Sequence, residues 1–128
     1  MISIFNARLS SRLTVGLALG AGIAAVDNLA RGGEASPIVV VAFLLIAATL
    51  VCAAWGRRGL PPAVALWACV PLAHVVKHLL GLPDTLHPNT CASILKLAAF
   101  SFVMTAVGTG CGTLIHKAIT RAPDAACE

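Results

Sequence analysis

The residues that could carry out chemistry in this chain are few, and most of them gather near the end of one apolar run. His74, Lys77 and His78 stand close together, and the segment that follows them supplies Asp84 and His87. On a helix, positions three and four apart are neighbours on the surface. His74 and His78 are therefore expected to share one face, with Lys77 beside them.

Two other segments add ionisable groups that we expect at the same level. Asp27 ends the first apolar run, and Lys96 lies just inside the last one. Ionisable side chains inside a membrane cost about 2.5–3.5 kcal/mol each at the helix centre, and they often mark function. The candidate ligand-binding residues are Asp27, His74, Lys77, His78 and Lys96.

Several chemistries fit this cluster. Lysine and histidine supply positive charge and hydrogen-bond donors for an anion or a lipid headgroup. A relay of His, Asp and Lys could instead carry protons for a coupled transporter. In the plainest interpretation, Lys77 and Lys96 extend their amines to the interface, and an ion pair of Asp27 with either lysine neutralises the rest.

A divalent metal ion is a further alternative. His74 and His78 have a spacing that suits zinc or copper on one helix face, and His87 and Asp84 complete a candidate metal set. The ammonium group of Lys77 would repel a cation at this position. The metal hypothesis therefore stands beside the others without displacing them.

The elements that must position these residues are four apolar runs, at about residues 13–30, 38–55, 62–80 and 94–115. Hydrophobic residues make up 59% of the chain and charged residues 11%, whereas soluble domains contain about 25% charged residues. Each run has about the 17–25 residues that cross a hydrocarbon core of about 30 Å. We expect an all-α, integral membrane four-helix bundle, formed by residues 1–128 as one transmembrane domain in the lipid bilayer. Short connections predict antiparallel consecutive helices in an up-down-up-down order.

Residues in the connections mark where the helices should begin and end. Pro61 and Pro62 favour the first turn of the third helix. Gly81 is typical of a helix end. Asn89 or Thr90 can cap the last helix through its side-chain oxygen.

The distribution of basic residues predicts the orientation. Loops on the cytoplasmic side of membrane proteins carry an excess of Lys and Arg. The basic residues that flank the runs on one side are Arg8, Arg12, Arg57, Arg58, Lys117 and Arg121. The first loop, on the other side, has Arg31 balanced by Glu34. Both termini are expected in the cytoplasm, with the helices in a bacterial inner membrane.

The first run also has a second interpretation. Two arginines followed by a short apolar stretch and the small residues Ala24 and Ala25 resemble a secretory signal. Cleavage there would leave three spans and would not change the orientation of the rest.

Small residues predict where the helices meet. Helices in lipid associate through close packing of small side chains and through polar contacts. The first run contains Gly16 and Gly20, and the last run has a stripe of Ser101, Thr105, Gly108 and Gly112. We expect these stripes to form helix contacts, either within one chain or between copies. The second run has almost nothing polar and is expected to face lipid.

Other function classes are less favoured. The sequence shows no nucleophile with its base, no phosphate-binding loop and no nucleotide fold, so an enzyme is the less favoured class. No extended basic or aromatic surface lies outside the apolar runs, so nucleic-acid binding is not expected. A haem held by two histidines is not expected either, because His116 lies at the opposite end of its run from His74 and His78.

The leading hypothesis is a small transport-type or binding protein that uses the outer cluster for an anion, a headgroup or an ion, and that forms homo-oligomers. The alternatives are a structural or accessory subunit of a larger membrane complex, and a metal-binding membrane enzyme or sensor.

Overall fold

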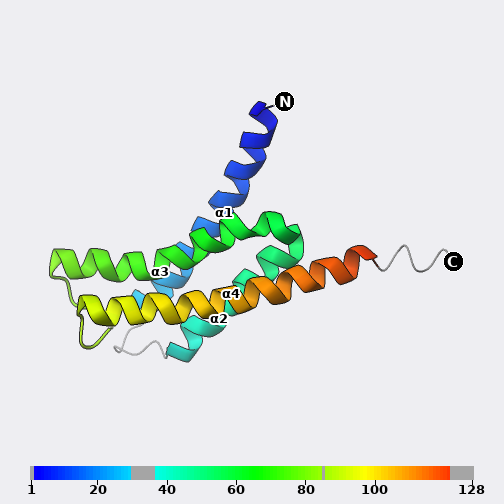
Figure 1. The fold of residues 1–128 in the computed structure, drawn as a ribbon. Coiled ribbons are helices and arrows are strands. Elements are labelled where there is room, and N and C mark those ends of the chain that lie inside the picture. Colours follow the sequence, from blue (N-terminus) through cyan, green and yellow to red (C-terminus); the bar gives the residue numbers. More distant parts are fainter. Residues whose placement is uncertain (1, 30–36, 85, 122–128) are drawn as a thin grey trace.

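The computed structural model of this 128-residue chain describes residues 2–29, 37–84 and 86–121. These residues form helices joined by short connections (Figure 1). The elements are α1 (Ile2–Leu29), α2 (Pro37–Trp55), a short 3-10 helix η1 (Gly56–Gly59), α3 (Leu60–Leu80) and α4 (Cys91–Arg121). The described part of the chain contains no strand, so the predicted all-α class is confirmed.

Three helical segments are long and apolar enough to cross a membrane: Leu9–Asn28, Ile38–Leu80 and Cys91–Arg121. The second segment contains α2, η1 and α3 together, because these elements follow one another in the chain without a loop between them. Large apolar side chains also cover the outside of the helices, and those of Ile38 and Leu79 are each 77% exposed. The chain therefore has the helices and the apolar exterior of a membrane protein.

The helix ends follow the local signals in the sequence. Prolines occupy the first turn of α3. Gly81 adopts a left-handed conformation with φ of 63°, and its N–H donates to the carbonyl of His78 at 3.3 Å. At the start of α4, the hydroxyl of Thr90 accepts the N–H of Ser93 at 3.3 Å. Thr90 is therefore the capping residue of the two candidates.

Helix α1 packs along α3, and the two helices run in the same direction. A Cβ atom added at Gly16 would collide with the backbone of Pro62, and one at Gly20 would lie 2.7 Å from the carbonyl oxygen of Leu66. The contacts advance along both helices together, which shows that the helices are parallel. The absence of side chains at both glycines allows this close approach.

Helix α2 packs in the same way on α4. A Cβ at Gly108 would lie 2.7 Å from the carbonyl oxygen of Leu45, and one at Gly112 would collide with the backbone at Thr49. The face of α2 turned toward these contacts is buried, with 0% exposure at Leu44, Ala48 and Cys52. The expectation that the second run faces lipid is therefore wrong for this face, although the rest of α2 is largely exposed.

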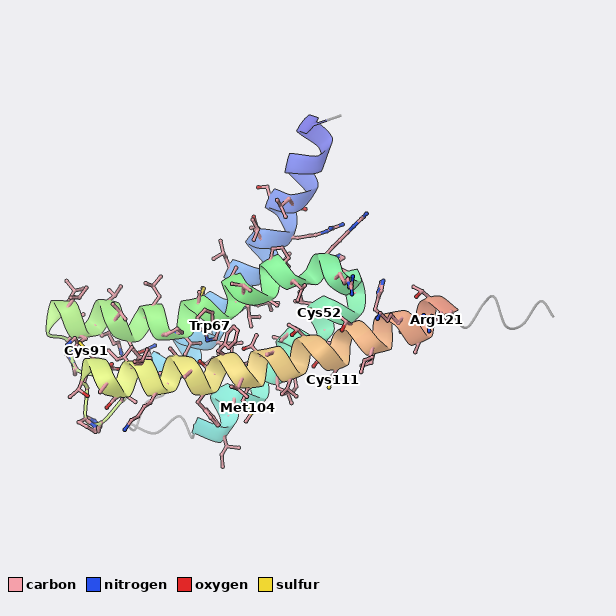
Figure 2. The ribbon with its side chains drawn as sticks, in the orientation of Figure 1. Cys52, Trp67, Cys91, Met104, Cys111 and Arg121 are labelled. Carbon is pink, nitrogen blue, oxygen red and sulfur yellow. The ribbon has the colours of Figure 1, made fainter. Side chains whose placement is uncertain are left out.

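Helices α3 and α4 form an antiparallel pair. The indole N–H of Trp67 on α3 donates to the carbonyl of Ala98 and to the hydroxyl of Ser101 on α4, at 3.1 Å each. The Trp67 ring also meets the edge of Phe102, with ring centroids 5.2 Å apart. Figure 2 shows Trp67 where the two helices run side by side.

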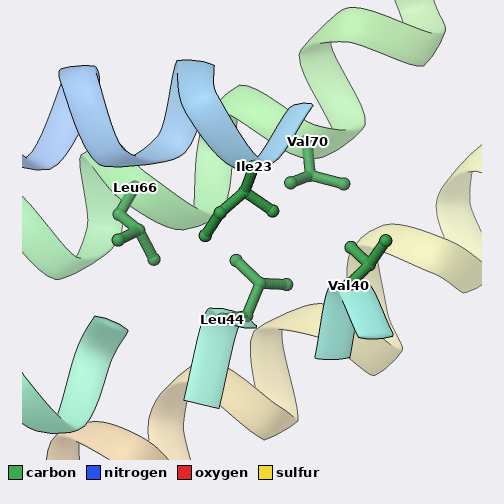
Figure 3. Close-up of a cluster of buried hydrophobic side chains, with 5 residues drawn as sticks. All are labelled: Ile23, Val40, Leu44, Leu66 and Val70. Carbon is green, nitrogen blue, oxygen red and sulfur yellow. The ribbon is translucent and has the colours of Figure 1, made fainter. Parts of the chain in front are cut away.

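The main packing of the fold joins helices that are not consecutive in the chain. We predicted that consecutive helices would be the antiparallel neighbours, but α1 packs most closely on α3, and α2 on α4. The physical reason is that the glycines let these two parallel pairs approach to backbone contact. A small apolar core joins α1, α2 and α3 and consists of Ile23, Val40, Leu44, Leu66 and Val70 (Figure 3).

Candidate functional site

A buried histidine between two carboxylates forms the central polar feature of the structure. His74 Nε2 lies 2.9 Å from Oδ2 of Asp27, and His74 Nδ1 lies 2.8 and 2.9 Å from the two carboxylate oxygens of Asp84. The side chains are 3% exposed for His74, 12% for Asp27 and 0% for Asp84. We call these three residues the triad.

The triad depends on three separate elements. Asp27 lies in the last turn of α1, and the parallel packing of α1 on α3 brings it to His74. Asp84 lies in the connection after α3. The left-handed turn at Gly81, together with the hydrogen bond from Leu82 N–H to the Lys77 carbonyl at 3.0 Å, begins the path of the chain toward Asp84.

The protonation of the triad is constrained by its geometry. A neutral imidazole has one N–H, so between two ionised carboxylates its other nitrogen would turn a lone pair toward a carboxylate oxygen. The arrangement is satisfied when one more proton is present, on the imidazole or on a carboxyl group. With that proton the triad carries one net negative charge, and Lys77, whose Nζ lies 4.0 Å from Asp84 Oδ1, balances it.

The structure brings together only part of the predicted cluster. In the plainest interpretation of the sequence Asp27 pairs with Lys77 or Lys96, but its described ion pair is with His74. His78 turns instead to Cys91, with 3.6 Å between Nε2 and Sγ. Lys96 is exposed and makes no ion pair with a described residue.

The metal hypothesis gains no support from this arrangement. Within residues 2–29, 37–84 and 86–121, no group of three or more His, Cys, Asp or Glu side chains is arranged to hold a metal ion. Both ring nitrogens of His74 already face carboxylates, and His87 is exposed in the connection before α4.

The polar residues of the last stripe serve packing between α3 and α4 and within α4. Thr105 and Ser101 are buried, and the Thr105 hydroxyl donates to the Ser101 carbonyl at 2.8 Å. The Ser101 hydroxyl donates to the Ala98 carbonyl at 3.2 Å and accepts from Trp67. Hydroxyls in lipid need such partners, because no water is present to replace them.

One feature of the triad escaped the sequence interpretation. Asp84 was expected near this cluster and was named as a metal ligand, whereas it supplies the second carboxylate to His74. A signal was present in the spacing, because Asp84 follows the helix-ending Gly81 closely enough for the chain to return toward α3.

Comparison of the chain with protein-family models, curated proteins and solved structures found no match.

Proposed function

We propose that this chain is a small bacterial inner-membrane protein of the transport type, and that the triad is its proton-binding site. In this proposal the chain crosses the membrane four times and has both termini in the cytoplasm. The triad then lies near the extracytoplasmic end of α1 and α3. The observation that carries the proposal is the buried His74 held between two carboxylates.

The length of the middle segment supports four spans. Ile38–Leu80 has 43 residues, which would extend about 65 Å as one straight helix. That is about twice the hydrocarbon thickness of about 30 Å. Helix α2 runs parallel to α4, and α3 runs antiparallel to α4. This supports a reversal at η1 that divides the segment into two spans of suitable length.

The position of the basic residues supports the orientation. Arg57 and Arg58 lie in η1, and Arg12 reaches the same end of the helices. An excess of Arg and Lys is typical of the cytoplasmic side. The triad is at the other end of α1 and α3, so in this proposal it lies on the outer side.

The chemistry of the triad suits a proton that is bound and released. The shared proton can reside on the imidazole or on either carboxyl group without movement of heavy atoms, because both nitrogens are within hydrogen-bond distance of an oxygen. Asp27 is the more accessible end, since its side chain is 12% exposed and that of Asp84 is 0% exposed. Gain or loss of one proton changes the charge of a buried site, and such a change has a large electrostatic effect where the dielectric is low.

A proton-flux assay tests this function. The full chain is reconstituted in phosphatidylcholine vesicles that contain a pH-sensitive dye, and a membrane potential is imposed with potassium and valinomycin. We expect proton flux that is lost in His74→Gln. His78→Gln is the matched control, because His78 lies one turn further on the same helix and its described side-chain contact is with Cys91.

A second function is supported by the charge balance of the same residues. The triad and Lys77 together are neutral when the shared proton is present, as expected of a structural cluster that locks α1 to α3. The protein would then act as an accessory subunit whose apolar faces pack on a larger complex. Two results together would favour this second function. The vesicles would show no proton flux that depends on His74, and His74→Gln would be less stable than the unchanged protein.

A further inference from the structure

A second polar site lies at the opposite end of the helices, away from the triad. Here α2 ends, η1 turns the chain and α3 begins. The structure has an open cleft of about 400 Å³ at this place. Its lining includes Arg12, Trp55, Arg57, Arg58 and His116. Asp27 and Arg12 are separated by about 22 Å along α1, from the rise of an α-helix, so the two sites are distinct.

The cleft collects positive charge from segments that are far apart in the sequence. Arg12 comes from α1, whereas Arg57 and Arg58 come from η1. The lining contains no Asp or Glu, and none of the three arginines makes an ion pair with a described residue. Three guanidinium groups around one cleft repel one another, and an anion between them would remove this repulsion.

Trp55 and His116, two other residues of the cleft lining, make further contacts that fix its shape. The Arg12 guanidinium carbon lies 5.9 Å from the centre of the Trp55 ring, a distance at which a cation is attracted to the ring face. The His116 ring closes another side, and its Nδ1–H donates to the Ala53 carbonyl at 2.8 Å. A Cβ at Gly56 would lie 2.7 Å from this ring, so only glycine leaves room for His116 there.

Orientation in the membrane does not by itself require this arrangement. Arginines that only retain a loop in the cytoplasm can point separately into water. Here Arg12 of α1 stacks on Trp55, the residue before η1. Arg12, Trp55 and the two arginines of η1 all line the same cleft. A built site for an anion accounts for this convergence.

We propose that this cleft binds a phosphate group at the cytoplasmic surface of the membrane. Arginine is well suited to phosphate, because its planar guanidinium donates two parallel hydrogen bonds to two phosphate oxygens. Tryptophan is enriched at the level of the lipid headgroups. The phosphate can belong to an anionic phospholipid or to a soluble phosphate compound, and the experiment separates these sources.

Trp55 provides the probe. The chain has two tryptophans, so Trp67→Phe leaves Trp55 as the single emitter. The full chain in maltoside detergent is titrated with inorganic phosphate, with short-chain phosphatidylglycerol, and with a short-chain diacylglycerol that lacks phosphate. We expect a saturable change in Trp55 emission with a phosphate ligand and none with the diacylglycerol. Saturation by phosphatidylglycerol alone identifies a headgroup site, whereas equal binding of inorganic phosphate identifies a soluble ligand.

Two variants test whether the cleft itself is responsible. Arg12→Lys keeps the charge but loses the two-pronged donor, and we expect it to weaken binding about tenfold, the effect of one lost charge-assisted hydrogen bond. Lys117→Gln removes an exposed charge of α4 that does not line the cleft, and we expect little change. The proposal is overturned if neither phosphate ligand changes Trp55 emission, or if Lys117→Gln weakens binding as much as Arg12→Lys does.

Discussion

Replacing His74 with leucine should strongly destabilise the protein, and the structure allows the size of the effect to be worked out. Leucine removes both hydrogen bonds of the triad and leaves Asp27 and Asp84 facing an apolar side chain. The Asp84 side chain is 0% exposed and that of Asp27 is 12% exposed,, so water replaces little of what is lost. Breaking a buried charge cluster by removing one member typically costs about 3–5 kcal/mol. Lys77, at 4.0 Å, can compensate only Asp84.

A recovery of stability is expected when the whole triad is removed. In the triple variant Asp27→Leu, His74→Leu, Asp84→Leu, none of the three buried ionisable groups remains, and Lys77 is left with a side chain that is 21% exposed. Replacing a complete buried ion cluster with apolar residues is often neutral or stabilising. We therefore expect the triple variant to be more stable than His74→Leu alone. His78→Leu is the control and should cost much less, since the described polar contact of His78 is the long one to Cys91.

The assay is equilibrium unfolding of the purified chain in mixed micelles with increasing SDS, followed by circular dichroism. Two results would refute the argument. One is a loss of less than about 1 kcal/mol in His74→Leu, a value typical of exposed ion pairs. The other is a triple variant that is no more stable than the single one.

Three further predictions concern packing and orientation. Gly112→Leu should separate α2 from α4 and lower the unfolding midpoint. At Gly110 a Cβ meets nothing within 4 Å, so Gly110→Ala should raise stability by about 0.5–1 kcal/mol because alanine favours the helix. Similar midpoints for both variants would contradict the close contact of Gly112 with α2. Trp67→Phe keeps the ring but loses its hydrogen bonds to α4, and we expect a loss of about 1 kcal/mol in the same assay; an unchanged midpoint would show that these bonds contribute nothing. Cys91 is exposed and contacts His78, one turn beyond His74 on α3, so a membrane-impermeant maleimide should label it from outside intact spheroplasts, and the labelling should be lost in Cys91→Ser. Labelling of Cys91 only after lysis would reverse the proposed orientation.

The helix ends could be predicted from the sequence because they depend on local chemistry. Gly81 ends α3 through its left-handed conformation, and Thr90 caps α4 through its hydroxyl. Neither feature needs information about a distant part of the chain. The choice between Asn89 and Thr90 needed the structure, since both residue types can accept the same N–H.

The pairing of helices could not be predicted in the same way. The glycine stripes show which face of a helix can approach another backbone, but they do not show which backbone it meets. Short connections favoured consecutive helices, and the structure instead pairs α1 with α3 and α2 with α4. The partner of Asp27 could not be chosen for the same reason, because spacing along α3 places His74 and Lys77 at almost the same level.

The two proposed sites share one mechanical support. Arg12 lies one turn before Gly16 on α1, and Asp27 lies beyond Gly20 on the same helix. Between them, α1 is held on α3 by backbone contact at both glycines, where no side chain can adjust to a shift. A movement of α1 along α3 would therefore displace Asp27 from His74 at one end and Arg12 from the cleft at the other. We therefore expect a ligand in the cleft and a proton on the triad to influence each other through the position of α1.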